Sequence, residues 1–416
     1  RYMKAREGGR VSGPFRYEPK FSSESLVTSF LVDPLRDFSF RAEVQMNDML
    51  ENYRLLGGIQ SSFDFKSGDV FAEFQFLPMT VDLSARIDRK VIFWETPAEE
   101  AADVELQKYT WQKFELGISY PLTVRTRITL KPFVGYTRFV DRGFDVVNSN
   151  PQTSLRTTQE QWYTGGRAEV IYDNSLTTGM NIIEGTRGKI GVIHYEGMRN
   201  SARSFSQASA DIRHYQKIYN EIVLAVRGYA GTFFGNAPKN YMLGGMDNWI
   251  ANRTNYEGLD NPLTNRVGRF NEGLLFHEFA TSLRGFDYAS LYGNSVALAN
   301  VELRVPLIRA LTSGPITSNF FRNMQLTAFY DIGSSWTGDI PFREGNSVRQ
   351  RVVPEDESGS PFRIELNEFI NPWLYSYGVG LRSMMLGYYL KFDLAWPVEN
   401  YEVKSPRFYA TLGFDF

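Results

Sequence analysis

The stretch SLRGFDYASLYGNSVALANVELRVPL, residues 282–307, ends in a strand pattern whose two faces differ in kind. Successive strand residues point to opposite faces, so alternate positions share a side. One side carries an amide, an acid and a base, Asn300, Glu302 and Arg304, and the other carries only Ala297, Ala299, Val301, Leu303 and Val305. This alternation predicts a strand that lies between an apolar and a polar environment.

The same alternation recurs along almost the whole chain. We count sixteen such segments, and an even number fits a closed antiparallel barrel. The sequence therefore predicts an all-β fold, a 16-stranded antiparallel transmembrane β-barrel. The expected strands are 24–32, 38–48, 52–65, 68–78, 80–94, 104–120, 122–140, 160–173, 187–199, 203–218, 219–235, 294–306, 323–337, 374–385, 386–397 and 405–416.

The connections between these segments are sorted by length. Tight turns follow the second, fourth, sixth, tenth and fourteenth segments, whereas long loops lie near 141–159, 236–293 and 338–373. Short turns on one rim and long loops on the other are typical of outer-membrane barrels, with the short rim periplasmic. A soluble β-sandwich would show the same alternation but has no reason to sort its loops. The pattern favours the membrane barrel.

The composition excludes several classes of function. The net charge of −2 gives no basic field for nucleic acid, and the absence of Cys excludes disulfides, thiolate metal sites and Cys nucleophiles. The three histidines, His194, His214 and His277, have no partner at metal-ligand spacing. No nucleotide-binding or nucleophile motif appears. We expect no enzymatic activity, no metal and no cofactor.

Three features resemble the BamA superfamily of outer-membrane assembly and translocation barrels. The first is a loop motif just before the strand that ends NVELRVPL, made of Leu283, Arg284, Gly285 and Phe286. The second matches the family's Phe-x-Asp-x-Gly and contributes Phe329, Asp331 and Gly333. The third is a terminal strand that looks like a C-terminal assembly signal, with Phe408, Phe414 and Phe416 on one face.

The resemblance implies a lock between a loop and the barrel wall. In the family, the long sixth outer loop folds back into the lumen, and the motif Arg pairs with the Asp of the second motif. Here Arg284 would pair with Asp331, and Glu302 is a possible second acceptor. The planar guanidinium suits a carboxylate, and Gly285 permits backbone angles that a side chain would forbid. The alternative is that Arg284 is an ordinary solvated loop residue and Asp331 an ordinary lumen acid.

The resemblance also implies a function and a domain plan. We expect residues 1–22 to link the barrel, 23–416, to a missing N-terminal periplasmic part. The barrel would insert outer-membrane proteins, or translocate polypeptides through a lateral seam and the lumen, in the bacterial outer membrane. Its partners would be membrane lipids, unfolded or secreted polypeptide clients, and periplasmic or surface lipoproteins. The alternative is a non-translocating scaffold that anchors a partner complex or a propeller domain.

Two further stretches bear on the subgroup and on the seam. YMLGGMDNW (241–249) and MNDMLENYRLLGG (46–58) resemble a subgroup whose barrel follows a TolB-type β-propeller rather than POTRA domains. The first strand, 24–32, is expected to be short, and Gly413 removes a packing side chain from the last strand. Both features predict a seam that parts easily, although weak first strands also occur in passive barrels.

Overall fold

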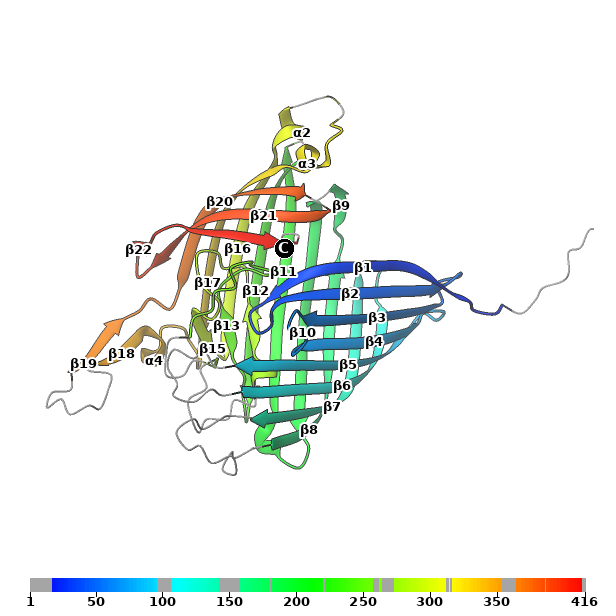
Figure 1. Ribbon diagram of the computed structural model, residues 1–416, viewed down its shortest axis with the longest axis horizontal. Coiled ribbons are helices and arrows are strands. Elements are labelled where there is room, and N and C mark those ends of the chain that lie inside the picture. The colour runs from blue at the N-terminus through cyan, green and yellow to red at the C-terminus, as the bar shows by residue number, and fades with distance from the viewer. Residues whose placement is uncertain are drawn as a thin grey trace, which may run out of the picture.

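A computed structural model describes residues 17–95, 106–141, 158–179, 181–219, 221–256, 262–263, 273–311, 314, 316–353, 364–385 and 387–413. Its dominant feature is one large antiparallel sheet that curls into a nearly closed barrel (Figure 1). Over these residues, no helix has the length and apolar character needed to cross a membrane.

Sixteen strands of 6 to 16 residues form the wall, each hydrogen-bonded to the next wall strand along the chain. Two short strands extend the sheet, β9 (Leu176–Gly179) beside β10 and β22 (Glu402–Val403) beside β21. The wall strands are β1 (Phe21–Asp33), β2 (Asp37–Asp48), β3 (Tyr53–Ser62), β4 (Gly68–Phe76), β5 (Asp82–Glu95), β6 (Leu106–Pro121), β7 (Thr126–Asp141), β8 (Thr158–Asp173), β10 (Ile182–Gly197), β11 (Phe205–Tyr219), β12 (Ile222–Gly235), β16 (Ser295–Pro306), β17 (Gln325–Trp336), β20 (Leu374–Met385), β21 (Tyr388–Glu399) and β23 (Arg407–Leu412).

The predicted number of wall strands is confirmed, but the prediction of a short first strand is wrong. β1 has 13 residues and pairs with β2 along its whole length, from Phe21 to Asp33. Its polar beginning is stabilised across the pair, because Gln45 and Asn47 of β2 both donate hydrogen bonds to the Glu24 carboxylate. A polar run therefore remains in the strand when the neighbouring strand supplies partners.

The predicted faces of the strands are also confirmed. On β16, Val301 and Leu303 are exposed on the outer side, whereas Asn300, Glu302 and Arg304 are buried. β17 and β21 follow the same rule: Leu326 and Phe392 are exposed, and Asp331, Lys391 and Asp393 are buried. The outer surface of the barrel is therefore an apolar band, and the charged side chains of these strands lie on the inner face.

A long insert joins β12 to β16. It spans residues 236–293, of which 236–256, 262–263 and 273–293 are described. It contains the 3-10 helix η2 (Leu274–Phe276) and a small sheet with the order β14 (Glu278–Ala280), β13 (Tyr241–Leu243) and β15 (Leu291–Gly293). Insert side chains such as Leu283 and Phe286 share one apolar cluster with wall side chains such as Phe233 and Leu298. The insert thus packs against the buried face of the wall.

Other connections carry short elements. η1 (Ser201–Arg203) precedes β11, and α2 (Leu307–Leu311) and α3 (Asn319–Arg322) join β16 to β17. The connection 338–373 was expected to be a long loop, but it contains α4 (Glu344–Ser347) and a hairpin of β18 (Val348–Val353) and β19 (Ile364–Phe369). This hairpin is a separate two-stranded sheet and is not part of the large sheet of the wall.

The barrel has one junction unlike the others. Among the described residues, β1 forms register pairs with β2 only, and β23 forms them only with β21. The first and last wall strands, drawn in blue and red in Figure 1, therefore flank a seam that no ladder of register pairs closes in the part of the chain that the structure describes.

Candidate functional site

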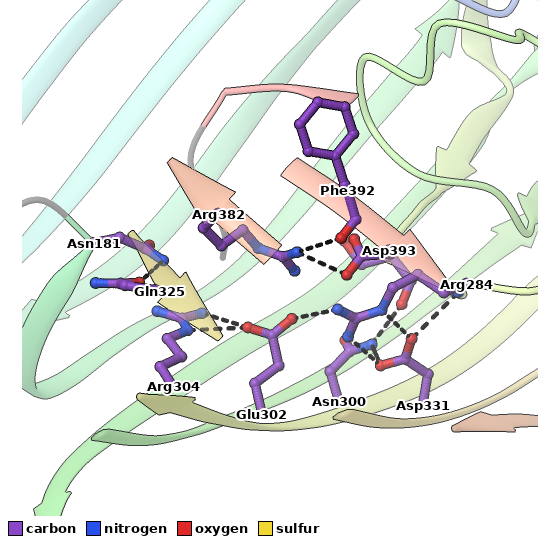
Figure 2. A network of polar contacts seen from close by, with 11 residues as sticks. Asn181, Arg284, Asn300, Glu302, Arg304, Gln325, Asp331, Arg382, Phe392 and Asp393 are labelled. Carbon is purple, nitrogen blue, oxygen red and sulfur yellow. Dashed lines mark hydrogen bonds and ion pairs between the residues drawn. The ribbon is translucent and has the colours of Figure 1, made fainter. Parts of the chain in front are cut away.

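The centre of the site is Arg284, whose side chain is completely buried. Its Nε lies 2.6 Å from Asp331 Oδ2 and its Nη2 lies 2.7 Å from Asp331 Oδ1, so one guanidinium edge holds both carboxylate oxygens. Its Nη1 donates to Glu302 Oε1 at 2.6 Å. Figure 2 shows the three side chains converging. The structure brings together the pair and the second acceptor that the resemblance implied, in the bidentate geometry that Arg and carboxylate favour.

The register of two neighbouring strands positions the acceptors. Asn300 of β16 lies opposite Asp331 of β17, and Glu302 lies opposite Phe329. Asn300 Nδ2 donates to Asp331 Oδ1 at 2.8 Å and also to the carbonyl of Ser282. The sequence places Asn300 in the polar row of its strand but indicates no specific role for it. The Asn300 amide connects the Asp331 carboxylate to the backbone of Ser282, just before the loop motif.

Stacking and close backbone approach complete the contact. The Arg284 guanidinium lies over the Phe329 ring, 3.6 Å from its centroid, a cation–π arrangement. Gly285 has a φ of 94°, and a Cβ there would lie 2.9 Å from Pro397 Cβ. Two reasons therefore favour glycine at this position: its positive φ is unfavourable for other residues, and the nearby Pro397 leaves no room for a side chain. The buried Phe286 accepts a hydrogen bond at its carbonyl from Tyr409 Oη, 2.8 Å away.

Gly333 has a packing role. A Cβ at this position would lie 3.1 Å from Leu243 Cδ2 and 3.2 Å from Leu298 Cδ1. Glycine in the Phe-x-Asp-x-Gly motif therefore leaves room for the YMLGG part of the insert against the wall. The two stretches of sequence that seemed separate meet at this point.

The charge network extends beyond the predicted residues. Arg304 donates to Glu302 Oε2 through Nε and Nη2, at 3.0 and 2.8 Å. Arg382 on β20 donates to Asp393 on β21 at 2.7 Å, and both are buried (Figure 2). Buried charges are tolerated only when they are paired. The sequence signal for the Arg382–Asp393 pair was their inward position on neighbouring strands, but their diagonal offset could not be read without the register.

The C-terminal residues are only partly described. Phe408 lies on the outer face of β23, where its ring stacks on Phe392 with a centroid separation of 6.1 Å. Phe414 and Phe416 lie outside the described residues. Phe408, the described residue of the predicted assembly signal, thus belongs to the apolar outer band.

One histidine of the insert is held neutral. Burial, together with the nearby Lys239 charge, lowers the pKa of His277 to about 3. Its Nδ1 accepts a hydrogen bond from the Asn240 backbone N–H at 3.0 Å, which requires the neutral ring. Within the part of the chain that the structure describes, no group of three or more potential ligands could hold a metal ion.

The contacts of Arg284 in the insert with Asp331 and Glu302 in the wall, supported by Asn300, form a clasp between the insert and the wall.

A sixteen-stranded transmembrane barrel with a loop motif clasped to its inner face defines a class of outer-membrane protein. The chain belongs to the Omp85 superfamily, whose domain matches residues 52–416. The predicted family resemblance is confirmed, and this membership places the barrel in the outer membrane.

Solved structures share the fold at low identity. The chain is similar to BamA from Haemophilus ducreyi lacking POTRA domains 1-3, with a TM-score of 0.55, 16% identity, 95% of this chain covered and 71% of that chain. It is also similar to CdiB from Escherichia coli, with a TM-score of 0.51, 12% identity, and 96% and 63% of the two chains covered. The chain thus spans less than two thirds of the CdiB chain. No curated protein matches the sequence.

Proposed function

We propose that this barrel inserts outer-membrane proteins into the membrane, or translocates polypeptides across it, by pairing client strands at the seam between β1 and β23. The observation that carries the proposal is the contrast in pairing. Every other neighbouring pair of wall strands forms an antiparallel ladder, a few of them with a bulge, whereas the described parts of β1 and β23 form no register pair with each other. Membership of the Omp85 superfamily supports the same function.

The physical argument concerns backbone groups in hydrocarbon. An unpaired N–H or C=O in the membrane costs several kcal/mol, so a strand edge at the seam binds any strand that satisfies it. Pairing with a client strand would be β-augmentation, in which main-chain hydrogen bonds supply the affinity. No covalent chemistry is required, and we propose that the protein is not an enzyme.

Two classes of proposed partner follow from the surfaces of the barrel. Lipids contact the apolar outer band, and unfolded or secreted polypeptides are the clients at the seam. Periplasmic or surface lipoproteins, a linker role for residues 1–22 and a TolB-type propeller before the barrel are further parts of the proposal. They rest on the family resemblance and not on contacts in the described residues.

A second function is favoured by a specific observation. The insert packs tightly on the inner face of the wall, and Arg284 is fully buried against it. A barrel whose insert is fixed to the wall in this way would serve as a scaffold that anchors a partner complex and moves no polypeptide.

The experiment that separates the two uses the full-length protein in liposomes. A urea-unfolded outer-membrane barrel is added, and its folded, protease-resistant form is followed with time. We expect faster folding than in empty liposomes. A photo-crosslinker at Leu26, an exposed residue of β1, should capture the client, whereas the same group at Leu130, an exposed residue of β7, should not. Unaccelerated folding without capture at Leu26 would favour the scaffold.

A further inference from the structure

A short part of the insert, residues 247–252, lies across the seam. It meets the outer edge of β23 as a strand would: the Ile250 N–H donates to the Ala410 carbonyl at 3.0 Å, and the Leu412 N–H donates to the Asn248 carbonyl at 3.4 Å. Between these two bonds, Trp249 forms an antiparallel bridge with Thr411. The segment therefore occupies backbone groups of β23 that point away from β21.

The side chains of this segment alternate as strand residues do. Trp249 is buried, and its ring centroid lies 4.5 Å from that of Tyr409 and 5.9 Å from that of Tyr288. Ile250 is exposed, on the same side as the outer face of β23. The segment thus places an aromatic side chain inward and an aliphatic one outward, as a barrel strand does.

The same segment also reaches the first strand. Asn248 Oδ1 accepts a hydrogen bond from the Val32 N–H at 3.2 Å. Asn252 Nδ2 donates to the Asp33 carbonyl at 3.3 Å and to the Asp37 carboxylate. Asn248 and Asn252 have φ values of 57° and 42°, a region that asparagine tolerates better than most side chains. Two tight bends therefore let one short segment touch both sides of the seam.

The segment is connected to the clasp around Arg284. The Leu283 N–H donates to the Gly245 carbonyl at 3.1 Å, and the Gly245 N–H donates to the Phe286 carbonyl at 3.1 Å. The Tyr288 hydroxyl donates to the Met246 carbonyl. The backbone just before residue 247 is thereby fixed to the loop motif, and the motif is fixed to the wall.

We propose that residues 247–252 are a seam latch that holds the edge of β23 in place of a client. The inference rests on the proposed function and deepens it. The client that displaces the latch is an extended polypeptide strand with an aromatic side chain at the position of Trp249, because that strand reproduces both the backbone bonds and the buried ring. Until a client arrives, the latch shields an edge that would otherwise pair with any exposed strand.

The test uses the absence of cysteine from the natural sequence. Ile250 and Ala410 lie opposite each other on the outer side, so I250C with A410C allows a disulfide that fixes the latch to β23. The matched control is V134C with T164C, an outward-facing opposed pair on β7 and β8, far from the seam. Each full-length variant is folded reduced, placed in liposomes and then oxidised, so the reduced form controls for folding.

Oxidation of the latch pair should lower the rate of client insertion by about tenfold or more, because the population with a free edge is removed. Reduction should restore the rate, and the control pair should insert clients equally in both states. If the oxidised latch variant inserts clients as fast as the same variant in its reduced form, the latch proposal is wrong and the proposed function stands. Failure of the wild-type protein to insert any client would instead overturn the proposed function.

A second measurement needs no client. W249A removes the buried ring but no backbone group, and it should increase hydrogen exchange of the peptide that contains Leu412 by about tenfold. Unchanged exchange would show that Trp249 does not hold the segment on the edge of β23, and it would contradict the latch even in a barrel without insertion activity.

Discussion

Two junctions of the wall, β16–β17 and β1–β23, are built in opposite ways. β16 and β17 pair without a break from Ser295–Trp336 to Pro306–Gln325, and the Arg284 clasp crosses their inner face. β1 and β23 are connected through a few bonds to residues 248–252 of the insert. The comparison shows that the insert is anchored to the wall at β16 and β17, where the ladder is unbroken. At the junction between β1 and β23, which form no ladder with each other in the described residues, the insert contacts both strands. We therefore expect the proposed opening to occur at the β1–β23 junction while the insert stays anchored to β16 and β17.

Removal of the anchor should have the largest effect. Arg284→Ala leaves Asp331 buried without its cation and removes one of the two cations of Glu302, which keeps Arg304, so we expect a loss of about 3–5 kcal/mol in the free energy of unfolding. Thermal unfolding of the barrel in detergent measures it. The control is Arg187→Ala, which removes a partly exposed ion pair with Asp173 and should cost less than about 1 kcal/mol. Equal losses in the two variants would show that the clasp is not an anchor.

A smaller effect should follow from a methyl group at the loop tip. Gly285→Ala introduces a Cβ at a positive φ and 2.9 Å from Pro397, and we expect a cost of about 1–3 kcal/mol. Gly188→Ala on β10 is the matched control, since a Cβ there meets no heavy atom within 4 Å. The two thermal midpoints give the answer, and a Gly285→Ala barrel as stable as the control would contradict the close approach.

The smallest expected effect is the pH dependence of thermal stability that His277 of the insert contributes. The pKa of His277 is lowered from 6.5 to about 3, so the packed insert disfavours the protonated ring. Its contribution to stability is complete above pH 6.5 and is lost as the pH falls towards 3. Wild-type protein should therefore lose more thermal stability between about pH 7.5 and about pH 5 than His277→Gln does. Parallel losses would contradict a buried neutral histidine.

The sequence was sufficient for the wall and for the centre of the clasp. Period-2 alternation identified the strands and their faces, because every wall strand has lipid on one side. The Arg284–Asp331 pair came from two motifs in a known order, and Glu302 from its position on the neighbouring strand. These features depend on local pattern or on resemblance, and both are visible in one sequence.

The seam could not be predicted to the same depth. Trp249 and Tyr409 are far apart in sequence, and nothing in the alternation of either stretch relates them. The length of β1 was missed because its first residues are polar, and their partners Gln45 and Asn47 lie on the next strand. The contact of Trp249 with Tyr409 and the full length of β1 both depend on tertiary contacts, which the sequence pattern does not show.

The most direct test of the account is whether the clasp holds the latch. Hydrogen exchange of the peptide that covers residues 407–413 should be followed in wild-type protein and in Arg284→Ala, with a β7 peptide as the reference. The Leu412 N–H donates to Asn248, so release of the insert from Asp331 should expose it. We expect faster exchange of that peptide in the variant and unchanged exchange in β7. Exchange at residues 407–413 that stays as slow as in the wild type would contradict it.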